Sequence, residues 1–194
     1  MKNINYLARL TFFCSLVLFS ACESMELDLA DNPNLLSPSQ ASPDFFLNAI
    51  QVDFANRIVE PFGRTGAELT RIDYMSGRDY ANAYSPASGN GRWTGSYQGM
   101  MMDIRTMNGL AEEAGLTHHV GMGQVFEAYA LITLVDFYGD VPYTEAFLGA
   151  DNLNPSVDGG ASIYASAIAL LDAAIVNFES EALADPELDY YYDG

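Results

Sequence analysis

The segment LVDFYGDVPYTEAF, residues 134–147, decides how the chain around it folds. Residues 125–137 are almost all apolar or helix-compatible, so a helix reaches into this segment. Gly139 supplies the permissive backbone of a helix stop, and Pro142 prevents the helix from continuing. The segment therefore predicts a helix that ends at Gly139 and is followed by an ordered loop.

Three carboxylates, those of Asp136, Asp140 and Glu145, stand among aromatic residues in this segment. Carboxylates in turns commonly accept backbone N–H bonds, so we expect all three to shape the loop. We interpret Asp136, Gly139, Asp140, Pro142 and Glu145 as a structural signature before any chemistry.

Other short motifs follow in a fixed order along the chain. They are DNPN at 31–34, W-x-x-x-Y at 93–97, P-x-x-D at 155–158, IY at 163–164 and LD-x-AI at 171–175. Together with VDFYGDVPYTEA at 135–146, they resemble the SusD/RagB family. These are outer-membrane lipoproteins of Bacteroidetes that bind glycans or other nutrients beside a TonB-dependent transporter. The resemblance is to the SusD-like branch with the Asn-Pro-Asn start.

This resemblance implies a mainly all-α fold, a tetratricopeptide-like scaffold of helical hairpins with long ordered loops. It implies an oligosaccharide ligand, a SusC-like TonB-dependent transporter as partner, and no cofactor. Family members are much longer, so residues 43–194 are expected to be the N-terminal part of a SusD-like helical domain. The strict tetratricopeptide repeat consensus is absent from the sequence.

Residues 1–21 have the pattern of a secretory signal, with Lys2 and Arg9 before an apolar stretch too short to span a bilayer. The sequence LFSAC at 18–22 resembles a lipobox, so Cys22 is the expected lipid anchor. The alternative is an ordinary cleavable signal followed by a buried cysteine. Residues 22–42 then form an acidic tether and linker, and the protein is expected on the outer membrane, facing the exterior.

The chain is strongly acidic, with a formal net charge of −18. Removal of Lys2 and Arg9 with the signal leaves 6 arginines against 26 acidic residues, a net charge of −20, and no lysine. Such a surface repels phosphate backbones, which excludes nucleic acid as a partner.

Glycine, proline and asparagine interrupt residues 76–92, which also carry tyrosines. A sugar ring stacks on an aromatic face while its hydroxyl groups bond polar side chains, so Arg78, Tyr80, Asn82 and Tyr84 are candidate glycan contacts. The alternative is that the tyrosines pack this loop onto the helices and Arg78 pairs with an acid.

Apolar residues at helical spacing predict five helices. They run from Pro43 until Pro61 and Gly63 end the first, from about Gly66 to Met75, from Trp93 to Ala114 before Gly115, from Thr117 into the 134–147 segment, and from about Ala161 to Glu181. The expected inner face of the last helix comprises Ile163, Tyr164, Ala167, Ile168, Leu171, Ala174, Ile175 and Phe178. The adjacent His118 and His119 lack companion ligands at suitable spacing, so no metal site is expected.

Catalysis is weighed against binding. Two carboxylates can hydrolyse a glycoside, and Glu112 with Glu113 or Asp136 with Asp140 are the available pairs. Glutamates 112 and 113 point in different directions on a helix, and Asp136 and Asp140 belong to the turn signature. The sequence therefore predicts no enzyme, and the resemblance to the SusD/RagB family implies a glycan-binding protein. The alternative function is a helical scaffold that docks the transporter without binding glycan.

Overall fold

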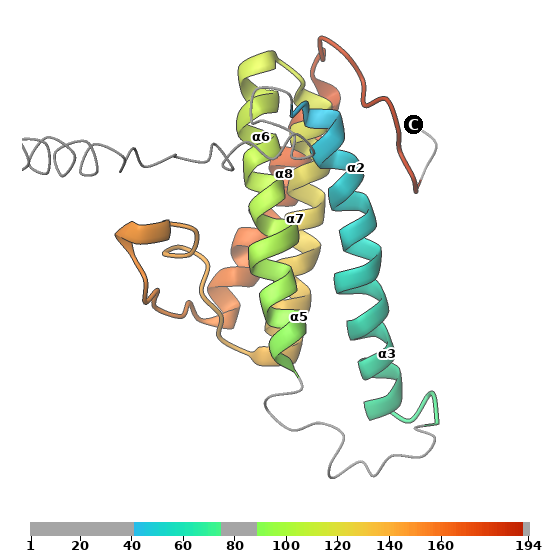
Figure 1. The fold of residues 1–194 in the computed structure, drawn as a ribbon, viewed down its shortest axis with the longest axis vertical. Helices are drawn as coiled ribbons and strands as arrows, with labels where there is room; N and C mark the ends of the chain where they lie inside the picture. The colour runs from blue at the N-terminus through green and yellow to red at the C-terminus, as the bar shows by residue number, and fades with distance from the viewer. Residues whose placement is uncertain (1–40, 75–88, 192–194) are drawn as a thin grey trace, which may run out of the picture. The chain divides into compact units, whose positions relative to one another are not determined.

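The computed structural model describes residues 41–74 and 89–191. These residues form helices and connecting loops, with no β-strand among them, which confirms the all-α prediction (Figure 1). The elements in chain order are α2 (Pro43–Asp53), η1 (Phe54–Val59), α3 (Glu60–Leu69), α5 (Asn90–Thr94), η3 (Gly95–Met101), α6 (Met102–Ala114), α7 (Thr117–Tyr138), η4 (Gly149–Asp151) and α8 (Gly160–Glu179).

The first rod is one helix made of α2, η1 and α3 (Figure 1). Ser42 caps it, because its hydroxyl accepts the N–H of Phe45 at 3.4 Å. The predicted stop at Pro61 and Gly63 was wrong, and so was a separate helix over 66–75. The segment η1 is a π-helix, and Pro61 sits in the first turn of α3. The wider π turn lets the helix pass a residue that has no N–H to donate.

The second rod joins α5, η3 and α6, and begins three residues before the predicted Trp93. Its middle segment η3 is also a π-helix. Gly95 and Gly99 lie against the side chain of Arg57, which pairs with Asp53 at 2.6 Å. A Cβ at Gly95 would stand 3.2 Å from the Arg57 guanidinium, so these glycines let the two π segments approach closely.

Gly115 ends the second rod with φ 70°, as the sequence predicts, and α7 follows after one further residue. The two helices run antiparallel, since Met107 meets Gly123 and Tyr97 meets Pro142. Their shared core consists of fully buried aliphatic and methionine side chains from both rods and α7, chiefly Leu47, Ile50, Ile58, Met100, Met101, Ile104, Met107, Leu131 and Leu134. This hairpin is the centre of the molecule.

Helix α8 packs antiparallel on α7, because Gly160 lies beside Val135 and Phe178 beside Gly121. Its predicted inner face was only partly right. Ile163, Ala167 and Ala174 are buried, whereas Tyr164, Ile168, Leu171, Ile175 and Phe178 form an exposed stripe. Tyr164 and Phe178, at the two ends of this stripe, still contact α7 through Asp136 and Gly121.

Both α7 and α8 are long and apolar enough to cross a membrane. Core helices meet the same criterion, and half of the apolar window of α7 is buried inside the protein.

Candidate functional site

The loop after α7, residues 139–159, projects from the side of the bundle (Figure 1). Gly139, at φ 79°, ends the helix as predicted. Val141 and Asp158 then close the base of the loop by exchanging backbone bonds of 3.2 and 2.9 Å. The Tyr97 hydroxyl donates to the Pro142 carbonyl at 2.7 Å, so the second rod fixes the same base.

Asp158 organises the first turn of this loop. Its carboxylate accepts the backbone N–H groups of Tyr143 at 2.8 Å and Thr144 at 2.9 Å, and the Thr144 hydroxyl at 2.8 Å. The bond from the Thr144 N–H is the main reason that the pKa of Asp158 lies below its usual value. The carboxylate is therefore held in its charged form.

Glu145 organises the far side of the loop. It accepts the Ser156 N–H at 2.9 Å and the Asn152 amide at 3.2 Å. The bond from the Ser156 N–H, more than any other interaction, lowers the pKa of Glu145. Asp140 accepts the first N–H of α8, from Gly160, at 2.9 Å. Asp140 and Glu145 thus each accept a backbone N–H bond, which is how carboxylates were expected to shape this turn.

Asp136 stands on the last turn of α7 and accepts the hydroxyl of Tyr164. Asp136 and Asp140, the pair weighed for glycoside hydrolysis, are each engaged in a structural hydrogen bond. Among the described residues, no group of three or more His, Cys, Asp or Glu side chains could hold a metal ion.

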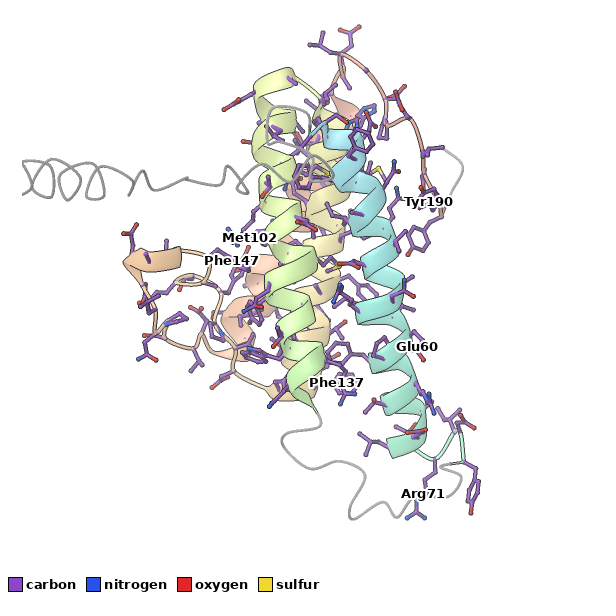
Figure 2. All side chains as sticks on the ribbon, in the orientation of Figure 1. Glu60, Arg71, Met102, Phe137, Phe147 and Tyr190 are labelled. Carbon is purple, nitrogen blue, oxygen red and sulfur yellow. The ribbon has the colours of Figure 1, made fainter. Side chains whose placement is uncertain are left out.

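Arg105 on α6 contacts two aromatic rings of the loop. Its guanidinium lies 4.3 Å from the ring centroid of Phe147 and 5.6 Å from that of Tyr143, and it bonds the buried Glu127 at 3.0 Å. Burial raises the pKa of Glu127, against the opposing effect of Arg105. Phe147 has φ 67°, a strained value for this residue, and Figure 2 shows it where the loop meets the bundle.

A second feature is the strap, residues 180–191, which returns from α8 to the first rod (Figure 1). The buried Gln51 side chain donates to the Leu188 carbonyl at 3.1 Å and accepts the Tyr190 N–H at 2.6 Å. Figure 2 shows Tyr190 beside this rod. The Tyr191 hydroxyl also donates to the Gln51 carbonyl, at 2.9 Å. The Gln51 side-chain amide thus donates to and accepts from the strap backbone, as a peptide group in a neighbouring strand would.

Two histidines hold the earlier part of the strap. His118 lies 2.6 Å from the Asp185 carboxylate, and the buried His119 lies 3.0 Å from Asp44. Asp44 also accepts the Glu187 N–H at 3.0 Å. Burial alone would raise the pKa of Asp44, but the bonds from Glu187 and His119 outweigh it and lower that pKa.

Between the strap and α7 lies an aromatic groove of about 730 Å³. Its lining consists of Phe54, His118, Met122, Val125, Phe126, Tyr129, Phe178, Asp185, Pro186, Asp189 and Tyr191. Half of Tyr129 and 42% of Tyr191 are exposed, so aromatic faces are open to solvent beside two carboxylates. This combination of apolar walls and a few polar groups is typical of a binding site.

The structure places Asp136, Gly139 and Asp140 where α7 meets α8, whereas Pro142 lies at the base of the loop against Tyr97 and Glu145 lies on the far side of the loop. Cys22, Arg78, Tyr80, Asn82 and Tyr84 lie outside the described residues. Sequence reasoning missed the roles of Arg105, Glu127 and Gln51, and it missed the groove. A lone arginine, glutamate or glutamine on a helix gives no spacing signal, because its partners are distant in sequence.

A comparison with solved structures agrees with the all-α fold of this chain. Residues 33–194 match the SusD-like family model, described as starch-binding associating with the outer membrane. The chain belongs to this SusD-like family, within the SusD/RagB group.

A solved SusD/RagB family protein from Bacteroides thetaiotaomicron is 26% identical, with a TM-score of 0.64. The match covers 74% of this chain and 32% of that protein, so this chain spans about a third of its length. No curated protein matches the chain.

Proposed function

We propose that this protein is a lipid-anchored glycan-binding protein of the outer membrane that passes oligosaccharides to a TonB-dependent transporter. The observation that carries the proposal is the SusD-like family match over residues 33–194, since the family is described as starch-binding at the outer membrane. The proposed function is the binding of glycans, without catalysis. The carboxylate pair on α7 and the loop, Asp136 and Asp140, is committed to hydrogen bonds that hold α8.

The anchor in this proposal is Cys22, acylated after removal of residues 1–21. Several acyl chains on one residue bind a membrane durably, whereas one chain binds marginally. Residues 23–31, which include the acidic Glu23, Glu26, Asp28 and Asp31, form the tether in this proposal. The domain that follows is the N-terminal part of a SusD-like fold, in keeping with the length of the matched structure.

The proposed glycan contacts are Arg78, Tyr80, Asn82 and Tyr84, because they combine aromatic faces with hydrogen-bonding groups. The aromatic groove is a second candidate contact, with Tyr129 as its most exposed ring. The open aromatic rings of this groove suit the stacking of a sugar ring.

Calorimetric titration with maltooligosaccharides tests the glycan half of the proposal. We expect saturable heat for the wild-type protein and a loss of affinity of about tenfold or more in Tyr80→Ala with Tyr84→Ala, since stacked aromatic contacts carry much of such binding. Tyr129→Ala asks the same question of the groove. Phe45→Ala, which removes an exposed aromatic ring outside both sets of candidate contacts, is the matched control.

Silence across a wider glycan panel would contradict glycan capture. If the same silent protein still co-purified with the transporter, the scaffold function would be the correct one.

A further inference from the structure

The aromatic groove between the strap and α7 has a wall of rings that support one another. The ring centroid of Phe54 lies 4.9 Å from that of Phe126 and 5.0 Å from that of Tyr129. Tyr191 comes from the strap, which lies beside the first rod (Figure 1), and its ring lies 5.9 Å from Phe54. Because the rings are already packed together, they lose little conformational freedom when a ligand binds.

Three rings of the groove are open to solvent. Tyr129, Phe178 and Tyr191 are 50%, 43% and 42% exposed. The face of an aromatic ring carries partial negative charge, so it attracts a cation. The same face can stack against the C–H groups of a sugar ring. The open rings therefore favour a ligand that combines a C–H face with a positive charge.

Two carboxylates, those of Asp185 and Asp189, also line the groove. Asp185 bonds His118 at 2.6 Å, and its side chain is 80% exposed, so its other acceptor sites are open to a ligand N–H. Asp189 accepts the Tyr191 N–H at 2.9 Å and adds a second negative charge. The carboxylates and the aromatic faces thus attract the same kind of group.

This negative charge is a property of the groove and not only of the acidic chain. Elsewhere on the helices, carboxylates face arginines, in the pairs Asp53–Arg57, Glu68–Arg64 and Glu127–Arg105. Among the described residues that line the groove, none is lysine or arginine, and His118 is the one basic side chain. Protonated His118 would balance only one of the two carboxylates. A negative charge therefore remains beside the open rings.

We propose that the aromatic groove binds oligosaccharides of amino sugars, with a sugar ring stacked on Tyr129 and its ammonium group directed to Asp185 and Asp189. The inference rests on the proposed function, because it names the class of glycan that this groove takes. An ammonium group is attracted by both the ring faces and the carboxylates. A neutral sugar gains only the stacking, and the carboxylate of a uronic acid is repelled.

Calorimetric titration of the full-length protein compares two tetrasaccharides of the same backbone. One is β-1,4-linked glucosamine, whose amines are protonated in weakly acidic buffer, and the other is its neutral N-acetylated form. We expect the charged tetramer to bind about tenfold more tightly at low salt. This preference should shrink in about half-molar salt, because screening weakens exposed charge pairs. A galacturonic acid tetramer should not bind to the groove.

Asp185→Asn with Asp189→Asn is the test variant. Asparagine removes both charges but keeps an acceptor oxygen for His118 and for the Tyr191 N–H. Glu60→Gln with Asp151→Asn is the matched control, listed here because it removes two charges from exposed residues outside the groove. We expect the test variant to lose the preference for the charged tetramer and the control to keep it.

Tyr129→Leu tests the ring separately from the carboxylates. Leucine keeps an apolar side chain at this exposed position but offers no aromatic face. We expect it to weaken the binding of the charged tetramer by about threefold or more. Thermal unfolding of all variants checks that the fold persists.

Equal affinity of the wild type for the two tetramers would overturn the inference and leave glycan binding intact. Loss of the preference in the control variant would also overturn it, because the attraction would then belong to the whole acidic surface. Hexylammonium that bound as tightly as the charged tetramer would overturn the sugar assignment. Silence with every glycan, maltooligosaccharides included, would overturn the inference together with the glycan half of the proposed function.

Discussion

Replacement of Asp158 by asparagine should open the loop without unfolding the helices. The carboxylate accepts three bonds, of 2.8, 2.9 and 2.8 Å, from Tyr143 and Thr144. Both N–H bonds go to one oxygen, Oδ2, so the single oxygen of an asparagine keeps them without the negative charge, and its NH₂ group then faces the Thr144 hydroxyl. The perturbation is small in volume, so the effect reports hydrogen bonding.

The expected magnitude follows from these contacts. Hydrogen bonds to a charged group contribute about 1.5–3 kcal/mol each when they are shielded from water. Neutral acceptors contribute about 0.5–1.5 kcal/mol per bond, and Asp158 is only partly buried, so solvent screening reduces the difference between the two side chains. We therefore expect the loop to lose about 1 kcal/mol of local stability, which corresponds to roughly fivefold faster exchange.

The assay is amide hydrogen exchange at Tyr143 and Thr144, read by NMR or mass spectrometry. Asp151→Asn is the control, because this residue lies in the same loop and its side chain is exposed. Unchanged protection of both amides in Asp158→Asn would refute the reasoning, since it would mean that the backbone holds the turn unaided.

The same carboxylate and Glu145 predict a pH dependence. Their pKa values are lowered in the folded protein from ordinary values of 3.8 and 4.5. The folded state therefore binds fewer protons, and the stability that these groups contribute is fully present above about pH 4.5. It is lost as the pH falls through the folded pKa values, and exchange at Tyr143 and Thr144 should accelerate there.

Further predictions concern the Arg105–Glu127 pair, the helix stop and the anchor. Arg105→Ala leaves Glu127 buried without its cation and should cost about 2–4 kcal/mol in urea unfolding, whereas Met at both positions should restore much of it. Equal stability of the single and double variants would contradict the stabilising role of the Arg105–Glu127 pair. Gly139→Ala should cost about 1–3 kcal/mol at φ 79°, while Gly63→Ala, in an open helical position, should stabilise slightly. Cys22→Ser should move the protein from the membrane to the soluble fraction, and retention in the membrane would disprove the anchor.

Local signals carried much of the fold. Pro43 marked a helix start, and Gly115 and Gly139 marked two helix ends, since each position requires a particular backbone conformation. The carboxylates of the 134–147 segment indicated an ordered turn, and Asp140 and Glu145 each accept one backbone N–H, whereas Asp136 accepts the Tyr164 hydroxyl instead. These features depend on neighbours in sequence, which is why the sequence alone predicts them.

Features that depend on residues distant in sequence could not be predicted from the sequence in this way. Pro61 is usually a helix breaker, and only the π segment before it shows how the helix continues. The outer stripe of α8 has the apolar spacing of an inner face, so its exposure depends on what packs beside it. The strap shows the same limit, because Gln51 and Tyr190 lie far apart in the chain.

The two π segments have an evolutionary consequence. A π turn is an α-helix that has absorbed one additional residue, so deleting one residue from Gly95–Met101 would give an ordinary α turn with both flanks in register. The same deletion in α6 would rotate every later side chain by about 100°. The same deletion in the other π segment, η1, would turn it into a regular α-helix. The ring of Pro61, which follows η1, would then clash with the preceding turn of that helix. Changes in length among relatives should therefore be tolerated at η3 and selected against at η1.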